Sequence, residues 1–244
     1  MSGSLYIVST PIGDSTDITL RAIEILRTCD IIVCEEFKPA KALLHKLSID
    51  KPLMELNEHS KAADTDEIIE ELRLEKNIAL ISDCGTPLIA DPGSSLVKKC
   101  IEEEISVIPI PGVSSILAAI VVSGFSLSQF SFIGFLPREK TERKKAAALL
   151  RNRPETMILL EAPYRLQQVL DDLESGIGSN RNACVCLDLT LPKEQIVRGT
   201  LSEIKSHFQE SPFKGEFVII IEGYKGSLRS GGRQNMPNLR VRNR

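Results

Sequence analysis

The stretch SDCGTPLIADPG, residues 82–93, follows a short apolar run at 78–81 and precedes a helix-like segment. It contains two prolines and two glycines. Each proline pushes the residue before it toward extended backbone, and Pro92-Gly93 fits the central positions of a type II turn. A stiff loop loses little entropy when a ligand binds, and Gly85 permits close approach to the backbone. The stretch is therefore either a binding loop after a buried strand or a stiff connector.

The first half of the chain alternates short apolar runs with helical patterns. We expect strands near residues 5–8, 31–34, 53–55, 78–81 and 106–110. Helical patterns near 19–27, 41–47, 66–74 and 94–103 lie between or after them. This alternation predicts a mostly parallel sheet with helices on both faces.

The second half predicts a different sheet. A helix of small residues at 114–122 follows Pro111-Gly112, where we place the domain boundary. Strands are expected near 130–135, 157–160, 183–189, 195–199 and 216–222, with helices at 140–151 and 165–174. The last strands are too close for parallel crossovers, so they must pair antiparallel. The fold class is α/β, with a mostly parallel domain over 1–112, a mixed-sheet domain over 113–226 and a cleft between them.

Composition excludes several classes of protein. With 244 residues, 42% of them apolar and 26% charged, the chain is globular. It has no apolar run of about 18 residues and no signal-peptide pattern, which indicates a cytoplasmic protein without a membrane span. Its six cysteines are scattered and form no CxxC pair, so we expect reduced, buried thiols and no metal site.

The end of the chain has a composition of its own. Residues 227–244 contain five arginines and no acidic residue, whereas the whole chain has a formal charge of -3. Few of these residues are apolar, which predicts a disordered basic tail. The tail either contacts RNA phosphates or is simply a solvated end.

Ligands of open α/β sheets bind at the carboxyl ends of the strands. Four loops qualify here, at residues 9–14, 35–36, 82–93 and 109–115. The chain has no GxGxxG, GxxxxGK[ST] or GxSxG motif, which argues against a dinucleotide, a phosphate-cradling or a hydrolase site. Pro11 removes an amide donor from the first loop. Such a loop suits a ligand held by carbonyl groups and apolar contact.

Seven segments, taken in order, indicate a family. They are LYIVSTPIGDSTDITLRAIEIL (5–26), LISDCGTPLIADPGSSLV (80–97), PIPGVSSILAAIVVSGF (109–125), FIGFLPREKTER (132–143), LEAPYRL (160–166), LTLPKEQIVRGTLSEI (189–204) and KGEFVIIIEG (214–223). Together they resemble the tetrapyrrole methylase superfamily, and more closely its branch of ribosomal RNA small subunit methyltransferases I. One such segment is weak evidence, whereas seven in order are strong evidence.

The resemblance implies a bilobal fold that binds S-adenosylmethionine, a homodimer, and 2'-O-methylation of a cytidine ribose in the 16S rRNA of the small ribosomal subunit. The cofactor contacts that it implies are Pro11, Cys84, Gly85, Thr86, Pro87, Ile89, Ser114, Ser115, Leu160, Leu189, Thr190 and Leu191. The substrate contacts that we expect are Arg21, Asn57, Lys144, Lys145, Tyr164 and Arg165, with Lys140 and Arg143 as further phosphate-binding candidates.

The chain departs from the branch at several positions near the expected acceptor. An acidic-Asp-Thr-Arg-His stretch is replaced by EEFKP at 35–39, and a histidine is replaced by Tyr164. Leu187 and Leu191 stand where the branch has an arginine and a lysine. These changes remove positive charge from the expected RNA side.

A ribose hydroxyl is a poor nucleophile, so we expect a general base near the methyl donor. Glu36 is the first choice because it follows a strand at its carboxyl end. The other candidates are Asp14, Glu58, Glu161 and Lys193. Glu161 and Arg165 could instead form an i,i+4 pair at the start of a helix. Methylation of a small molecule such as a corrin, and a non-catalytic binding module, remain as alternatives.

Overall fold

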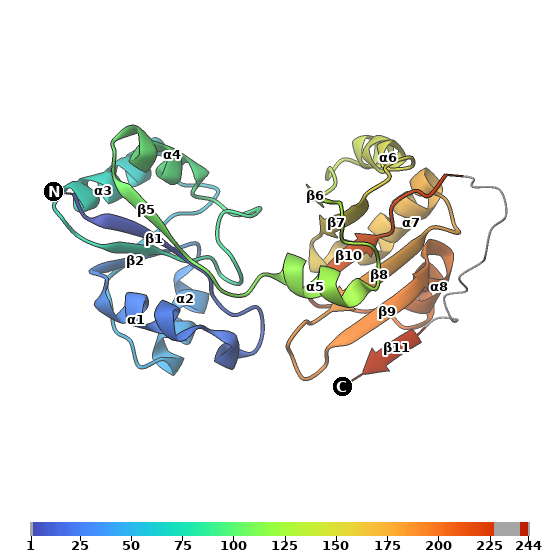
Figure 1. Cartoon of the computed structure of the whole chain (residues 1–244), viewed down its shortest axis with the longest axis horizontal. Helices are drawn as coiled ribbons and strands as arrows, with labels where there is room; N and C mark the ends of the chain where they lie inside the picture. Colours follow the sequence, from blue (N-terminus) through green and yellow to red (C-terminus); the bar gives the residue numbers. More distant parts are fainter. Residues whose placement is uncertain (1, 227–239, 244) are drawn as a thin grey trace. The chain divides into compact units, whose positions relative to one another are not determined.

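The computed structural model describes residues 2–226 and 240–243, the last four by their backbone alone. The chain divides into two compact units between Ser114 and Ser115 (Figure 1). Each unit has its own sheet and its own buried core. No helix in the described ranges is long and apolar enough to cross a membrane.

The first unit is a parallel sheet covered on both faces, as its sequence predicted. Its strands are β1 (Ser4–Val8), β2 (Ile31–Cys34), β3 (Leu53–Glu55), β4 (Ile78–Leu80) and β5 (Ser106–Ile110), in the order β3-β2-β4-β1-β5. Helices α1 (Leu20–Thr28) and α2 (Phe37–Lys46) pack on one face. Helices α3 (Ala62–Arg73) and α4 (Ser94–Glu102) pack on the other (Figure 1).

Helix α2 begins earlier than its sequence pattern predicted. The expected start was near Lys41, but the helix starts at Phe37. Pro39 lies in the first turn, where backbone N–H groups need no partner within the helix. The early start brings Phe37 and Lys41 onto one helix, one turn apart.

The second unit contains a mixed sheet, also as predicted. Its strands are β6 (Phe130–Gly134), β7 (Thr156–Leu160), β8 (Asn182–Leu187), β9 (Gln195–Thr200), β10 (Phe217–Ile221) and β11 (Arg240–Asn243). Their order is β11-β9-β8-β10-β7-β6, in which β6 and β7 are parallel and the other pairs are antiparallel. The short helix η2 (Pro163–Arg165) follows β7.

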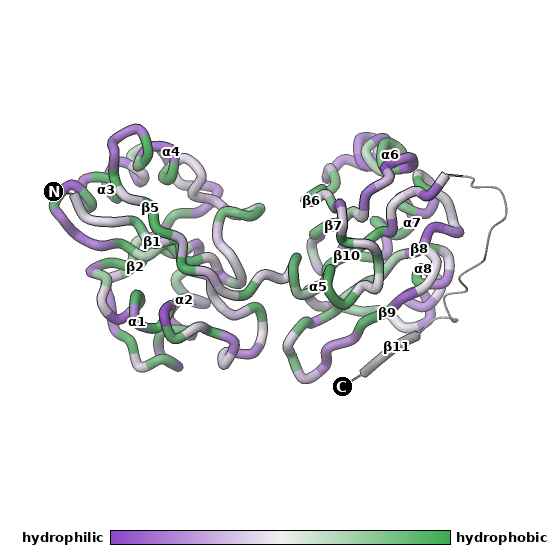
Figure 2. The backbone as a smooth tube through the Cα atoms, viewed as in Figure 1, coloured by the Kyte–Doolittle hydropathy of each residue, from purple (hydrophilic) through white to green (hydrophobic). Residues whose placement is uncertain are grey.

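Helices α6 (Lys140–Leu149), α7 (Leu166–Ile177) and α8 (Leu201–Glu210) pack on one face of this sheet. Helix α5 (Ser115–Ser123) packs on the other face, and its sequence SILAAIVVS is apolar along most of its length (Figure 2). Sequence patterns missed α8, although Thr200 and Glu203 form a capping box at its start. A Thr-x-x-Glu spacing before an apolar run was the signal that would have found it.

The expected disordered tail differs from the structure at its end. Residues 240–243 form β11, which pairs antiparallel with the edge of β9. The alternating residues Arg240-Val241-Arg242 suit a strand at a sheet edge, and β9 offers unpaired backbone groups there. The remainder of the predicted tail, 227–239 and 244, lies outside the described residues.

Candidate active site

Hydrogen bonds tie together three of the loops that were expected to bind a ligand. Thr10 and Gly85 exchange backbone hydrogen bonds, with N···O distances of 2.8 and 3.1 Å. The Thr86 hydroxyl donates to the carbonyl of Val113 at 2.9 Å, and it lies 3.1 Å from the hydroxyl of Ser9. The loops after β1, β4 and β5 therefore form one connected rim at the carboxyl end of the sheet.

Backbone strain is concentrated in two loops. In the described residues, seven non-glycine positions have positive φ, and three of them directly follow a helix C-cap, where this conformation is common. The other four are Leu88 (72°), Ala90 (70°), Asp188 (45°) and Thr190 (66°). Each such position costs about 1–3 kcal/mol, and this kind of strain clusters at ligand-binding sites. Both loops, after β4 and after β8, were expected to hold the cofactor.

The backbone conformation and the close neighbouring atoms at positions 85 and 93 require glycine. Gly85 has φ +80°, and a Cβ there would lie 3.3 Å from Cγ2 of Ile12. Gly93 has φ +111°, and a Cβ there would lie 3.0 Å from Cδ2 of Leu88. Cys84 and Ile89 project from the same loop and are exposed, whereas Pro87 is buried beneath it. The loop thus presents a thiol and an apolar side chain to solvent.

In the second unit, Leu160 and Leu189 pack against the same cluster as α5, the helix that Ser115 begins. Leu189 lies in a tight turn, in which Leu191 N–H donates to the carbonyl of Asp188 at 3.0 Å. The N–H of Thr190 donates to the Glu194 carboxylate at 2.9 Å. Leu160, Leu189 and the helix begun by Ser115 thus lie on one face of this sheet.

Carboxylates crowd the carboxyl ends of β2 and β4. Asp83 accepts a hydrogen bond from the backbone N–H of Glu36 at 3.3 Å. Burial, together with the negative charges of Asp91, Asp83, Glu36 and Glu58, raises the pKa of Glu35 to about 7. Burial also raises the pKa of Asp91 to about 6. At neutral pH this group of side chains holds a proton that an isolated carboxylate would have lost.

Sequence reasoning chose Glu36 as the base and passed over its neighbour. The structure places Glu36 in solvent, at the N-cap of α2, and Glu35 half-buried among the carboxylates. Both residues follow a buried strand, so only the direction that the chain takes after Cys34 distinguishes them. Glu58 is exposed and lies 3.6 Å from His59, while Asn57 accepts a hydrogen bond from His59 N–H within the same turn.

Four other predicted site residues have exposed side chains. Arg21 is exposed at the start of α1, and Lys193 is exposed in the second unit. Asp14 is exposed and caps a short helix by accepting from Thr16. Tyr164 is 75% exposed. All remain available to a large substrate.

Two predicted substrate contacts are instead buried ion pairs. Arg165 lies 3.0 Å from Glu161 and donates to the carbonyl of Pro137 at 2.9 Å. Arg143 lies 2.6 Å from Asp172, with both side chains 6% exposed. These guanidinium groups face the interior, so they hold loops and helices together and do not reach RNA phosphates. The alternative of an i,i+4 pair is therefore the correct one for Glu161 and Arg165.

We expect Arg165→Met to lower the free energy of unfolding by about 3–5 kcal/mol, because it leaves Glu161 buried without its partner. One oxygen of that carboxylate already has no hydrogen-bond partner in the described part of the protein. Urea denaturation followed by circular dichroism measures the loss. Lys144→Met, on the exposed side of α6, is the control and should change stability by less than about 0.5 kcal/mol. Equal effects of the two substitutions would contradict the structural role of the pair.

The cysteines do not form a metal site or a disulfide in the described ranges. Five of the six are buried, and Cys84 is the exposed one, in the loop at 82–93. A thiol at this position is accessible from solvent.

Comparison with known proteins agrees with this geometry. Residues 4–205 match the family of Tetrapyrrole (Corrin/Porphyrin) Methylases. The chain is 42% identical to Ribosomal RNA small subunit methyltransferase I of Halalkalibacterium halodurans, over 91% of this chain and 76% of that protein. It is 41% identical to the protein of that name from Bacillus subtilis, over 91% and 75%.

Among solved structures, the fold resembles uroporphyrin-III C-methyltransferase from Thermus thermophilus in complex with S-adenosylhomocysteine. The TM-score is 0.64 at 17% identity, over 90% of this chain and 97% of that one. At this identity the likeness concerns the fold alone. The family match and the two relatives go further: the chain belongs to the tetrapyrrole methylase family and, within it, to the ribosomal RNA small subunit methyltransferases I.

Proposed function

We propose that the protein transfers a methyl group from S-adenosylmethionine to the 2'-oxygen of a cytidine ribose in 16S rRNA. S-adenosylmethionine is the methyl donor of the family to which the chain belongs. The observation that carries the proposal is the strained loop at 82–93, tied to its neighbours beside a group of carboxylates. This region joins a connected ligand-binding rim to a side chain that can accept a proton.

The residues of the first unit fit the methyl donor. Gly85 and Thr86 hold the loop against the segments after β1 and β5, while Cys84 and Ile89 present apolar surface. When bound, S-adenosylmethionine supplies an activated methyl group on a positively charged sulfur. Alignment of an acceptor oxygen with that group can contribute about 7–11 kcal/mol to lowering the barrier.

Glu35 is the side chain that we propose as the general base. Its pKa of about 7, raised by burial, keeps it partly deprotonated at neutral pH and strong enough as a base to attract the hydroxyl proton. Such a base contributes about 10²- to 10⁴-fold to the rate. The nearby carboxylates Asp83 and Asp91 favour its protonated form and so help it to take up a proton.

Mapping of ribose methylation in the small-subunit rRNA of a deletion strain tests the acceptor. We expect one cytidine to lose its 2'-O-methyl group and to regain it when the gene is restored. A map that does not change contradicts the rRNA assignment. In the cells with the restored gene we expect the protein in the cytoplasm. Sedimentation of the purified protein should show a homodimer.

We expect Lys144 and Lys145 to contact RNA phosphates. Both are exposed on α6, and Lys145 forms an exposed ion pair with Glu142, at 2.8 Å. Neutralising both should weaken binding to small subunits and lower the slope of log affinity against log salt by about 1–2. Filter binding at several salt concentrations measures this. Replacing the exposed Lys98 of α4 should leave the slope unchanged. An unchanged slope in the double variant excludes this patch.

A further inference from the structure

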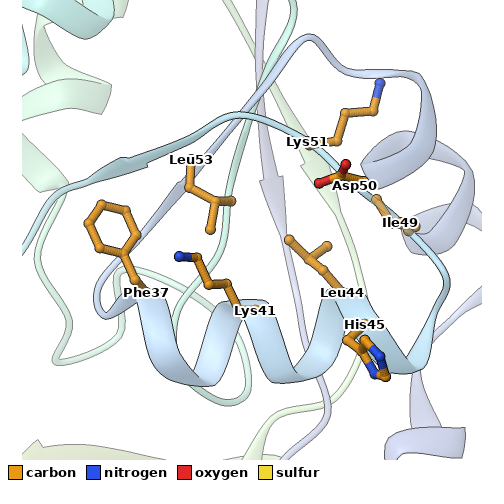
Figure 3. A pocket seen from close by; sticks show the side chains of 8 residues that line it. All are labelled: Phe37, Lys41, Leu44, His45, Ile49, Asp50, Lys51 and Leu53. Atoms are coloured by element: carbon orange, nitrogen blue, oxygen red, sulfur yellow. The ribbon is translucent and has the colours of Figure 1, made fainter.

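A concave site apart from the methyl-donor rim lies on the first unit, along α2. Its volume is about 510 Å³, within the range of small-ligand pockets. Its wall is formed by α2 together with the segment that leads into β3 (Figure 3). The lining residues are Phe37, Lys41, Leu44, His45, Ile49, Asp50, Lys51 and Leu53. None of them belongs to the methyl-donor rim.

The pocket combines an aromatic ring with a cation above an apolar floor. Phe37 is 39% exposed, and the Lys41 ammonium lies 5.6 Å from its ring centroid (Figure 3). Leu44 and Ile49 are buried and form the floor. Exposure of a phenylalanine ring to water is unfavourable, and the ring offers a flat surface on which another ring can stack.

Charge is distributed unevenly along α2. The carboxylates Glu35, Glu36 and Asp83 gather where the helix begins. Further along, Lys41 and Lys51 line the pocket, with Asp50 as its single acid. The positive charge that can attract a polyanion therefore lies along the pocket and not at the start of α2.

We propose that this pocket binds one nucleotide of single-stranded RNA, with the base stacked on Phe37 and the adjoining phosphates near Lys41 and Lys51. The proposal rests on the RNA methyltransferase function and names a further contact of that substrate. Stacking on an aromatic side chain beside a basic one is how proteins hold unpaired bases. The ten residues of α2 span about 15 Å, so the pocket lies within a few nucleotides of a ribose beside Glu35.

Phe37→Trp tests the stacking directly, because the chain contains no tryptophan. The single indole should lose fluorescence when a single-stranded oligocytidylate is added, since a stacked base quenches it. Phe130→Trp places an indole at a similarly exposed position, on β6 of the other unit, and should respond little. If the fluorescence of Phe37→Trp does not change at saturating RNA, the proposal is overturned. The pocket would then bind something other than RNA, such as a protein segment.

Two alanine variants test the contribution to affinity. Phe37→Ala should weaken oligocytidylate binding about 5- to 150-fold, the range found for one stacked base. Lys41→Ala should weaken it less and lower the salt slope by about 1, whereas Lys46→Ala, at the end of the same helix, should leave both unchanged. Binding of S-adenosylhomocysteine should be unaffected in all three variants.

These results separate the two proposals. If the unsubstituted protein binds neither the oligocytidylate nor small subunits, the RNA methyltransferase function and the subsite are both contradicted. If it binds RNA, and Phe37→Ala and Lys41→Ala bind it equally well, only the subsite is contradicted.

Discussion

Replacing Gly85 with valine is expected to weaken the binding of S-adenosylhomocysteine at least 100-fold. Gly85 has φ +80°, a conformation that a β-branched residue rarely adopts. A Cβ at this position would also press on Ile12, at 3.3 Å. The loop would have to move, and its paired backbone hydrogen bonds with Thr10 would be lost. Isothermal titration calorimetry with S-adenosylhomocysteine measures the effect.

A matched control separates this local effect from general destabilisation. Gly124 has φ +84°, but a Cβ there would meet no atom within 4 Å. Gly124→Val therefore carries the same backbone strain, about 1–2 kcal/mol, without touching the donor loop. Both variants should remain folded by circular dichroism, and only Gly85→Val should lose the ligand. Binding by Gly85→Val within a few-fold of the unsubstituted protein would remove this loop from the cofactor site.

The second large effect is expected for Glu35→Gln, which removes the proposed base and keeps its size. The rate of methyl transfer to small subunits should fall about 10²- to 10⁴-fold at saturating cofactor. Glu36→Gln, its exposed neighbour, should retain most of the activity. If Glu36→Gln loses activity and Glu35→Gln does not, the assignment that the sequence favoured is the right one.

The raised pKa of Glu35 also has consequences for pH dependence. Because the base acts in its deprotonated form, the rate should rise with pH through about 7. The stability of the fold should change with pH in the opposite direction to the rate. The pKa of Glu35 is about 7 in the folded protein, whereas an unperturbed glutamate side chain has a pKa of 4.5. The folded state thus binds the proton more tightly, and the contribution of this group to stability is lost as pH rises from 4.5 through 7.

Glu35→Gln should therefore stabilise the protein at pH 8 while it slows the reaction. The full shift corresponds to about 3 kcal/mol, and the partial exposure of the carboxyl reduces the expected gain to about 1 kcal/mol. At pH 4 the gain should disappear. Denaturation curves of the two proteins at both pH values measure it, and a variant less stable at pH 8 would contradict the crowding of carboxylates around Glu35.

Most of the architecture could be read from local patterns. β2 and β5 have the predicted bounds, because short apolar runs between helical patterns mark strands clearly. The parallel and mixed sheets followed from the lengths of the connections. Two helix predictions were wrong. The start of α2, whose first turn contains Pro39, was placed too late, and α8 was not predicted because its capping box was overlooked.

The site could be predicted only in outline. The loops at 9–14, 82–93 and 109–115 were recognisable from prolines and glycines at the ends of strands, and the structure joins them. Arg143 and Arg165 looked like surface cations, yet each is buried against an acid, Asp172 and Glu161. Spacing suggested the pair of Arg165 with Glu161 but did not show its burial, and nothing in the sequence shows that Asp172 faces Arg143 from another helix.

Residue order and local chemistry thus specified the two sheets and the positions of their loops, because these depend on periodicity, turn residues and connection length. Three other properties depend on tertiary packing: the burial of two arginines, the shifted pKa of Glu35 and the pocket between Phe37 and Leu53. Each arises where side chains distant in sequence exclude water from one another, and electrostatic energies depend on that exclusion as much as on charge. Those properties therefore become visible when the chain is folded.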